Sequence, residues 1–439
     1  MRVSISDIKE LRGDKITWTV IAILSLISLL VVYSSTGSLA FKNKDGNTEF
    51  YLLKHLILQI LGFGLMYLAY RTPYKYYAKI SVLAFIVVIP LLIYTILFGS
   101  NINQASRWIT IPFVGLTLQS SDPAKLVLIT FLAFQLTKHK NDLGNWTGGF
   151  AWIMGPVALV TLLILPANFS TAALIFLLCL IMMFVGSTPI KNLVTILVAG
   201  LIGVIILLSV SESLNKAFPE NKIFKRTKTW VSRIKVFAGK EEDKSKLQDL
   251  TYQLNQSKIA IANGEITGVG PGNSKQRNFL PHPYSDFIYA IIVEEYGIMG
   301  SAVIIILYLI LFYRGIVIAT KVKSRFGALL AFGLSLAIII QATINVFVAQ
   351  GLFPVTGQPL PLVSMGGTSM WFTCLGLGML QSVCRNSQET EAEQDIYGRN
   401  DGTEGDDDEY EYVDEDELDE SEEKEAEEIE KQNSEKNQS

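Results

Sequence analysis

The sequence predicts an all-α polytopic membrane protein that crosses the bilayer about ten times. Half of its 439 residues are hydrophobic, and the mean hydropathy is +0.35. Soluble domains of this length do not carry apolar residues in long uninterrupted runs. The first run, 16–35, is long enough to cross a bilayer, which takes about 20 apolar residues. Similar runs recur along the chain, which is why we expect a bundle of spanning helices.

Ten runs are candidate transmembrane spans. They cover residues 16–35, 51–70, 77–99, 123–138, 149–165, 168–186, 190–210, 285–313, 325–350 and 364–385. No small-residue cleavage site follows the first run, so we expect an uncleaved signal anchor. The chain is therefore expected to divide into an N-terminal segment 1–15, a membrane domain 16–385 and a tail 386–439.

Positive charge sets the expected orientation, because short cytoplasmic loops are enriched in Lys and Arg. With ten spans, most of these residues fall on one side: Arg2, Lys9, Arg12, Lys15, Arg71, Lys75, Lys79, Lys138, Lys140, Lys191, Arg314, Lys321, Lys323, Arg325 and Arg385. The opposite short loops offer Lys42, Lys44 and Arg107. We therefore expect both termini in the cytoplasm and the long loop 211–285 on the outer side of the cytoplasmic (inner) membrane.

Charge is divided unevenly between the membrane part and the tail. From Glu389 onward, 24 acidic residues stand against 4 basic ones, which leaves the preceding residues with a net charge of +16. The tail is expected to be disordered, either as an interaction tail or as a solvated tail that limits association. The basic excess of loop 211–285 fits a solvated face, an amphipathic helix on the outer leaflet or a site for an anionic substrate. We expect no nucleic-acid partner.

Cysteine and histidine offer little chemistry. Cys179, Cys374 and Cys384 lie in or at the end of spans, with neither a metal spacing nor a disulfide framework.

Polar residues gather on the expected outer side around the fourth span. Arg107 and Trp108 suit an interfacial position. Asp122 and Lys125 are three residues apart and would share a helix face. Asp122 before Pro123 also fits a helix cap, with Lys125 extending towards the interface; the alternative is a lysine that reaches a phosphate.

Two glycine-rich loops are further candidates. Gly268, Gly270 and Gly272 precede Lys275 and Arg277, and their amides would either bind phosphate or belong to a flexible turn. The segment 353–370 is interrupted by three prolines, and non-helical backbone at a membrane edge is tolerated where it is buried or lines a cavity. We expect this segment to line a cavity. Its candidate substrate-binding residues are Thr356, Gly357, Ser364, Gly366 and Gly367.

Asp286, Glu294 and Glu295 lie near or in the eighth span, where a carboxylate costs free energy because it is close to lipid. Each of them is therefore expected to have a functional or structural role. On a continuous helix, Glu294 would lie about 12 Å deeper than Asp286, and Glu295 would point to the far side. Asp286 is therefore expected to lie apart from the two glutamates, at the outer end of the eighth span. Its role would be that of an N-cap beside Ser285 or that of a catalytic acid or base. The two glutamates are expected to support helix packing.

The motifs NQASRWI, QSSDPAK, AIANGEITGVGPGNSKQ, FLPHPYSDFIYAIIVEEYGIMG and TGQPLPLVSMGGTSM occur in this order. With them, residues 15–385 resemble the SEDS family, the shape, elongation, division and sporulation proteins, and are most similar to its division branch. The resemblance implies a ten-span glycosyltransferase that polymerises lipid II into peptidoglycan strands at the division septum. It also implies a class B penicillin-binding protein and other division proteins as partners.

The resemblance also assigns roles to residues. Asp286 matches the family's essential aspartate, Arg107 and Lys125 match positions near the substrate cavity, and Ser364, Gly366 and Gly367 match the outer loop motif. Three positions depart from the family pattern. Asp122 stands for the usual glutamate, Asn168 for an aspartate, and His282 for a glutamate close to Asp286.

One carboxylate suffices for the implied reaction, because only the attacking sugar hydroxyl must lose a proton. The diphosphate leaving group needs positive charge from Arg107, Lys125, Lys275, Arg277 or a divalent cation such as Mg or Mn. The rival readings are a lipid II flippase or other transporter, with Glu294 and Glu295 as transport acids, and a noncatalytic division scaffold.

Overall fold

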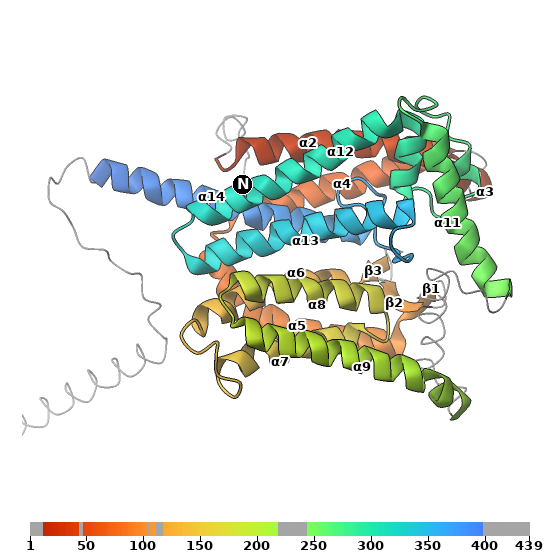
Figure 1. The fold of residues 1–439 in the computed structure, drawn as a ribbon. Helices are drawn as coiled ribbons and strands as arrows, with labels where there is room; N and C mark the ends of the chain where they lie inside the picture. Colours follow the sequence, from red (N-terminus) through yellow and green to blue (C-terminus); the bar gives the residue numbers. More distant parts are fainter. Residues whose placement is uncertain (1–11, 44–46, 103–104, 111–116, 218–243, 398–439) are drawn as a thin grey trace, which may run out of the picture. The chain divides into compact units, whose positions relative to one another are not determined.

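The computed structural model describes residues 12–43, 47–102, 105–110, 117–217 and 244–397. These residues form a bundle of α-helices with one small sheet (Figure 1). The chain divides into two units, Met1–Thr390 and Glu391–Ser439, and the bundle belongs to the first. The expectations for residues 1–11 and for the tail from 398 onward concern residues outside the described part of the chain.

Each of the ten expected spans corresponds to a helix, although some helices begin or end a few residues away from the expected bounds. The helices are α2 (Lys15–Ser35), α3 (Gly37–Asn43), α4 (Thr48–Arg71), α5 (Lys75–Phe98), α6 (Ser121–Lys138), α7 (Gly149–Ile164), α8 (Phe169–Val185), α9 (Ile190–Ala217), α11 (Lys244–Gly264), the short 3-10 helix η1 (Gln276–Asn278), α12 (Ile288–Lys321), α13 (Arg325–Gln350) and α14 (Thr368–Tyr397). Among the described residues, α2, α4, α5, α12 and α13 are long and apolar enough to cross a membrane, while α7, α8 and 190–206 are shorter apolar helices. The polytopic helical fold is confirmed, and the number of ten spans stays a prediction.

A three-stranded antiparallel sheet is the part of the fold that the all-α expectation missed. Its strands are β1 (Ser100–Ile102), β2 (Ala105–Thr110) and β3 (Thr117–Gln119), in the order β1-β2-β3. Trp108 pairs with Gln119 across β2 and β3. The aromatic and β-branched residues of SRWIT favour a strand. The sheet lies at the same end of the bundle as α11 (Figure 1) and leads directly into α6.

Helix α12 begins later than expected and is broken. Its N-cap is Phe287, so Asp286 lies before the helix and is not its cap, and the helical-face geometry expected for Asp286 is wrong. Gly297 has a φ of 67°, which interrupts the helix. The backbone amides of Ile298 and Met299 donate instead to the carbonyls of Glu265 and Ile266, at 3.0 and 3.2 Å. The segment after α11 therefore supplies the partners that the broken helix lacks.

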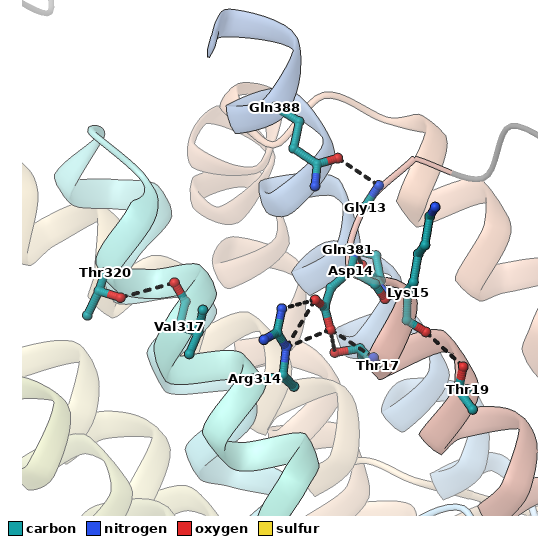
Figure 2. A network of polar contacts seen from close by, with 10 residues as sticks. All are labelled: Gly13, Asp14, Lys15, Thr17, Thr19, Arg314, Val317, Thr320, Gln381 and Gln388. Atoms are coloured by element: carbon teal, nitrogen blue, oxygen red, sulfur yellow. Dashed lines mark hydrogen bonds and ion pairs between the residues drawn. The ribbon is translucent and has the colours of Figure 1, made fainter. Parts of the chain in front are cut away.

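A buried aspartate joins three helices at the start of α2 through its carboxylate and its backbone (Figure 2). Asp14 caps α2 by accepting from the backbone amide and hydroxyl of Thr17, at 2.8 and 2.6 Å. Arg314 of α12 donates from Nε to both oxygens of Asp14, at 3.0 and 3.1 Å, and its Nη2 completes the ion pair. Gln381 of α14 accepts from the Asp14 amide at 2.9 Å and donates to its carbonyl at 3.0 Å. One residue thus ties α2, α12 and α14 together.

Removing this carboxylate should destabilise the fold in a pH-dependent way. Burial opposes ionisation of Asp14, but hydrogen bonds from Arg314 and Thr17 outweigh it and lower its pKa. A folded pKa below the unfolded value of about 3.9 stabilises the protein above that pH, and the contribution is lost as the pH falls through the folded pKa. We expect Asp14→Asn, which keeps a capping oxygen, to lower the unfolding temperature at neutral pH, by a difference from wild type that shrinks below about pH 4.

The measurement is thermal unfolding of the detergent-solubilised chain across pH. Asn47→Ala serves as the matched control, because Asn47 caps α4 through the Phe50 amide at 3.0 Å and is uncharged. That control should cost about 1 kcal/mol at every pH. An Asp14→Asn effect that is equally independent of pH would contradict the assignment.

Candidate functional site

Asp286 lies in the loop that enters α12 and is half-buried. Its Oδ1 accepts a hydrogen bond from the Ser285 hydroxyl at 3.1 Å. Its backbone carbonyl accepts from Asn345 Nδ2 of α13 at 3.0 Å. The neighbouring Tyr284 is partly buried, and burial together with the charge of Asp286 raises the pKa of the tyrosine. The carboxylate is therefore held on a loop fixed from α13.

The segment 353–367 packs against this loop. The buried hydroxyl of Ser364 accepts from the Leu360 amide at 2.7 Å and donates to the Ser285 carbonyl at 2.8 Å. The Met365 amide donates to the Tyr284 carbonyl at 2.9 Å. The Ser364 hydroxyl, which was expected to bind substrate, thus holds the loop of Asp286 in place.

The other candidate residues of this segment shape its backbone. Gly357 and Gly367 have φ values of 69° and 58°, which favour glycine. A Cβ on Gly366 would lie 3.4 Å from Cγ of Pro359, so the backbone approaches its neighbour closely there. Thr356 is buried, and its hydroxyl has no hydrogen-bond partner among the described residues. Of these four, Thr356 therefore brings the side chain that could serve a ligand.

Lys125 reaches the same region from α6. Its Nζ donates to Gln341 Oε1 of α13 at 2.6 Å. Asp122 is buried one turn away, where its charge interacts with Lys125, and its Oδ2 has no hydrogen-bond partner among the described residues. The cap of α6 is Ser120, so the expected capping role of Asp122 is wrong. Arg107 lies in β2, and its side chain lies outside the described part of the structure.

Lys275 and Arg277 belong to a different set of contacts. Arg277 Nη1 donates to the Ser34 carbonyl of α2 at 2.9 Å. The side chain of Lys275 is exposed, and its backbone amide donates to Glu294 Oε1 at 3.3 Å. Glu294 also accepts from the Ser274 hydroxyl. Hydrogen bonds thus connect Lys275 and Arg277 with α12 and α2, whereas Lys125 and Asp286 are connected through α13.

The two buried glutamates of α12 now have partners. Glu294 accepts from Gln276 N at 3.2 Å, and Glu295 accepts from the Ser34 hydroxyl and lies where the charge of Arg277 acts on it. Each acid is therefore anchored to a neighbouring segment, as expected for a packing role.

The glycine loop does not offer free amides to a phosphate. The Gly268 amide donates to the Gly264 carbonyl at 2.8 Å, and the Gly270 amide donates to the Glu295 carbonyl at 3.0 Å. The phosphate reading is therefore wrong for these two amides. Gly268 is required for packing, because a Cβ there would lie 2.2 Å from the Glu295 carbonyl oxygen.

Two alanine substitutions in this loop should differ sharply. Gly268 and Gly272 have nearly equal φ values, 81° and 78°, but a Cβ on Gly272 would meet no atom within 4 Å. Both changes cost about 1–2 kcal/mol of backbone strain. Gly268→Ala should in addition break the contact with α12 and greatly lower the unfolding temperature and the yield of folded protein. Equal unfolding temperatures for the two variants would refute this.

The residues that sequence reasoning missed are amides. Gln341, Asn345 and Gln358 hold the site together, and Gln358 Nε2 donates to the Thr171 hydroxyl at 2.6 Å. A signal was present in IIIQATINVFV, where two amides four residues apart interrupt an apolar helix. Their partners could not be known, because they lie in distant parts of the sequence.

The donor set does not form a multi-carboxylate metal site. Within the described residues, no group of three His, Cys, Asp or Glu side chains could hold a metal ion. The divalent cation expected as one possible source of positive charge therefore has no such cluster to bind among the described residues.

Comparison with known proteins identifies the group to which this arrangement belongs. The sequence model of the cell cycle proteins FtsW, RodA and SpoVE matches residues 14–389. A probable peptidoglycan glycosyltransferase FtsW of Coxiella burnetii is 30% identical over 382 residues, which cover 85% of this chain and 96% of the relative. A protein with the same description from Geobacter sulfurreducens is 31% identical over 390 residues, covering 86% and 96%.

Solved structures share the fold. A chain from a peptidoglycan synthase complex, described as coordinating polymerization and crosslinking, has a TM-score of 0.64 at 21% identity and covers 85% of this chain and 98% of that one. The rod shape determining protein RodA of Thermus thermophilus has a TM-score of 0.61 at 19% identity, covering 86% and 99%.

Proposed function

This chain belongs to the FtsW, RodA and SpoVE family of cell cycle proteins, the SEDS family, and from that premise we propose that it is a peptidoglycan glycosyltransferase. It polymerises lipid II into glycan strands at the outer face of the cytoplasmic membrane during cell division. The observation that carries the proposal is the placement of Asp286, whose loop is hydrogen-bonded both to α13 and to the segment 353–367.

Asp286 acts as the general base. The acceptor's sugar hydroxyl gives its proton to the Asp286 carboxylate as its oxygen attacks the anomeric carbon of the donor. The new C–O bond forms as the bond to the lipid diphosphate breaks, and the diphosphate leaves as an anion without needing a proton. Direct displacement inverts the α-linked donor to a β-linkage. A carboxylate on a fixed loop suits this role, because a base must lie within hydrogen-bond reach of the proton it removes.

Lys125 stabilises the charge that develops on the diphosphate. Its ammonium donates a hydrogen bond to Gln341, and an ammonium group can donate three in all. Arg107, Lys275 and Arg277 remain candidate diphosphate ligands, and Asp122, Thr356, Gly357, Ser364, Gly366 and Gly367 remain candidate substrate-binding residues.

The strand made here must be crosslinked by another protein. The similar fold within a peptidoglycan synthase complex supports a class B penicillin-binding protein as the partner. We propose that this partner and other division proteins meet the chain at the division septum, with both termini of the chain in the cytoplasm.

Replacing the base should greatly slow polymerisation without unfolding the protein. We expect Asp286→Asn to slow lipid II polymerisation by about 10²–10⁴-fold, the usual contribution of a positioned base. The assay uses purified full-length protein with its penicillin-binding partner and lipid II, and glycan products are separated by length. Glu265→Gln is the matched control, because Glu265 is an exposed carboxylate in the loop 211–285, which is expected on the same outer side of the membrane as Asp286. Normal polymerisation by folded Asp286→Asn would refute the role of Asp286.

A further inference from the structure

Helix α13 carries two buried amides on one face. Gln341 and Asn345 are 6% and 1% exposed. Residues four apart on a helix are neighbours on its surface, with Cβ atoms about 5–6 Å apart. Burying an amide is costly unless it is hydrogen-bonded, so both side chains need partners nearby.

Gln341 uses both ends of its amide. Its Oε1 accepts from Lys125 Nζ at 2.6 Å, and its Nε2 donates to the Pro359 carbonyl at 2.8 Å. An amide can accept and donate at once, which neither an ionised carboxylate nor an apolar side chain can do. The lysine of α6 is therefore tied through α13 to the segment 353–367.

Asn345 makes the equivalent link one turn further along α13. Its Nδ2 donates to the Asp286 carbonyl at 3.0 Å and to the Gln358 carbonyl at 2.8 Å. Pro359 and Gln358 are consecutive, so the two amides hold adjacent carbonyls of the same segment. Lys125 and Asp286 are consequently fixed to one face of one helix and to one dipeptide.

We propose that Gln341 and Asn345 are positioning residues that set the separation of Lys125 and Asp286 in the glycosyl transfer. This inference rests on the proposed function. Neither amide needs to touch the reacting atoms. The base must face the acceptor hydroxyl while the ammonium faces the diphosphate, and these groups lie on opposite sides of the anomeric carbon in a direct displacement. A misplacement of about 1 Å in such an arrangement can cost about 10²-fold in rate.

The two roles that Gln341 could have, positioning and packing, predict opposite orders of activity. Gln341→Glu keeps the acceptor for Lys125 and loses the donor to the Pro359 carbonyl, whereas Gln341→Met fills a similar volume and loses both. Under the proposal, Gln341→Glu retains more lipid II polymerisation than Gln341→Met, which should fall by about 10- to 100-fold. If Gln341 served packing alone, the buried charge of glutamate would be the worse change. A Met variant at least as active as the Glu variant overturns the proposal.

Asn345 is tested by separating turnover from substrate binding. Asn345→Ala should lower kcat by about 10- to 100-fold with little change in KM, because it displaces the base and leaves the diphosphate ligands in place. An unchanged kcat, or a rise in KM alone, would overturn the role. Ser335→Ala is the control on the same helix, because the buried Ser335 hydroxyl donates to carbonyls of its own preceding turn.

A second measurement does not depend on activity. The rate at which a small amine-selective reagent acylates Lys125, followed by mass spectrometry, should rise severalfold in Gln341→Met and stay near wild type in Ser335→Ala. An unchanged rate in Gln341→Met contradicts the proposal even if the variant polymerises poorly. Absence of polymerisation by the wild-type chain with its partner would instead refute the proposed function, while the acylation comparison would still test the link from Gln341 to Lys125.

Discussion

Polar groups inside an apolar bundle must find their partners within the protein, because lipid offers them none and an unpaired buried group costs several kcal/mol. This constraint accounts for the arrangement of the site. Lys125 of α6 donates to the side-chain amide of Gln341 on α13. The backbone carbonyl of Asp286 accepts from the side-chain amide of Asn345, one turn further along the same helix. The buried amides of α13 need hydrogen-bond partners, and the partners that they bind include the two residues proposed to carry the chemistry.

The same constraint explains the break in α12. Gly297 leaves the helical conformation, and the amides that lose their helical partners bond to carbonyls of the segment after α11. That segment can approach closely because residue 268 has no side chain. Glu294 and Glu295 precede the break, and each binds a separate neighbouring segment. Acidic side chains in an apolar helix thus fix the segment after α11 and the end of α2 onto it.

Hydropathy was enough to predict the long apolar helices, because long apolar runs have few alternatives to a buried or lipid-facing helix, but it did not predict α3 or α11. The family motifs singled out Asp286, Lys125 and Ser364, whose roles stay predictions. Local sequence could not show that Asp286 precedes α12, that Asp122 lies inside α6 rather than at its cap, or that the glycine amides are already bonded. Those outcomes depend on contacts between residues far apart in the chain, such as Lys125 with Gln341 or Ser34 with Arg277.

The departures from the family pattern can be interpreted in the same physical terms. Asn168 caps α8 through the Thr171 amide at 3.3 Å. The Thr171 hydroxyl accepts from Gln358, so this end of α8 contacts the segment 353–367. The neutral side chain of Asn168 is therefore sufficient to cap the helix there. His282 has a φ of 58° and an exposed ring whose Nδ1 lies 3.2 Å from the Tyr284 hydroxyl. Neither residue belongs to the hydrogen bonds that link Asp286 and Lys125 to α13. A mechanism that needs one base and a fixed cation therefore tolerates both substitutions, whereas a mechanism that required a second acid at position 282 would not.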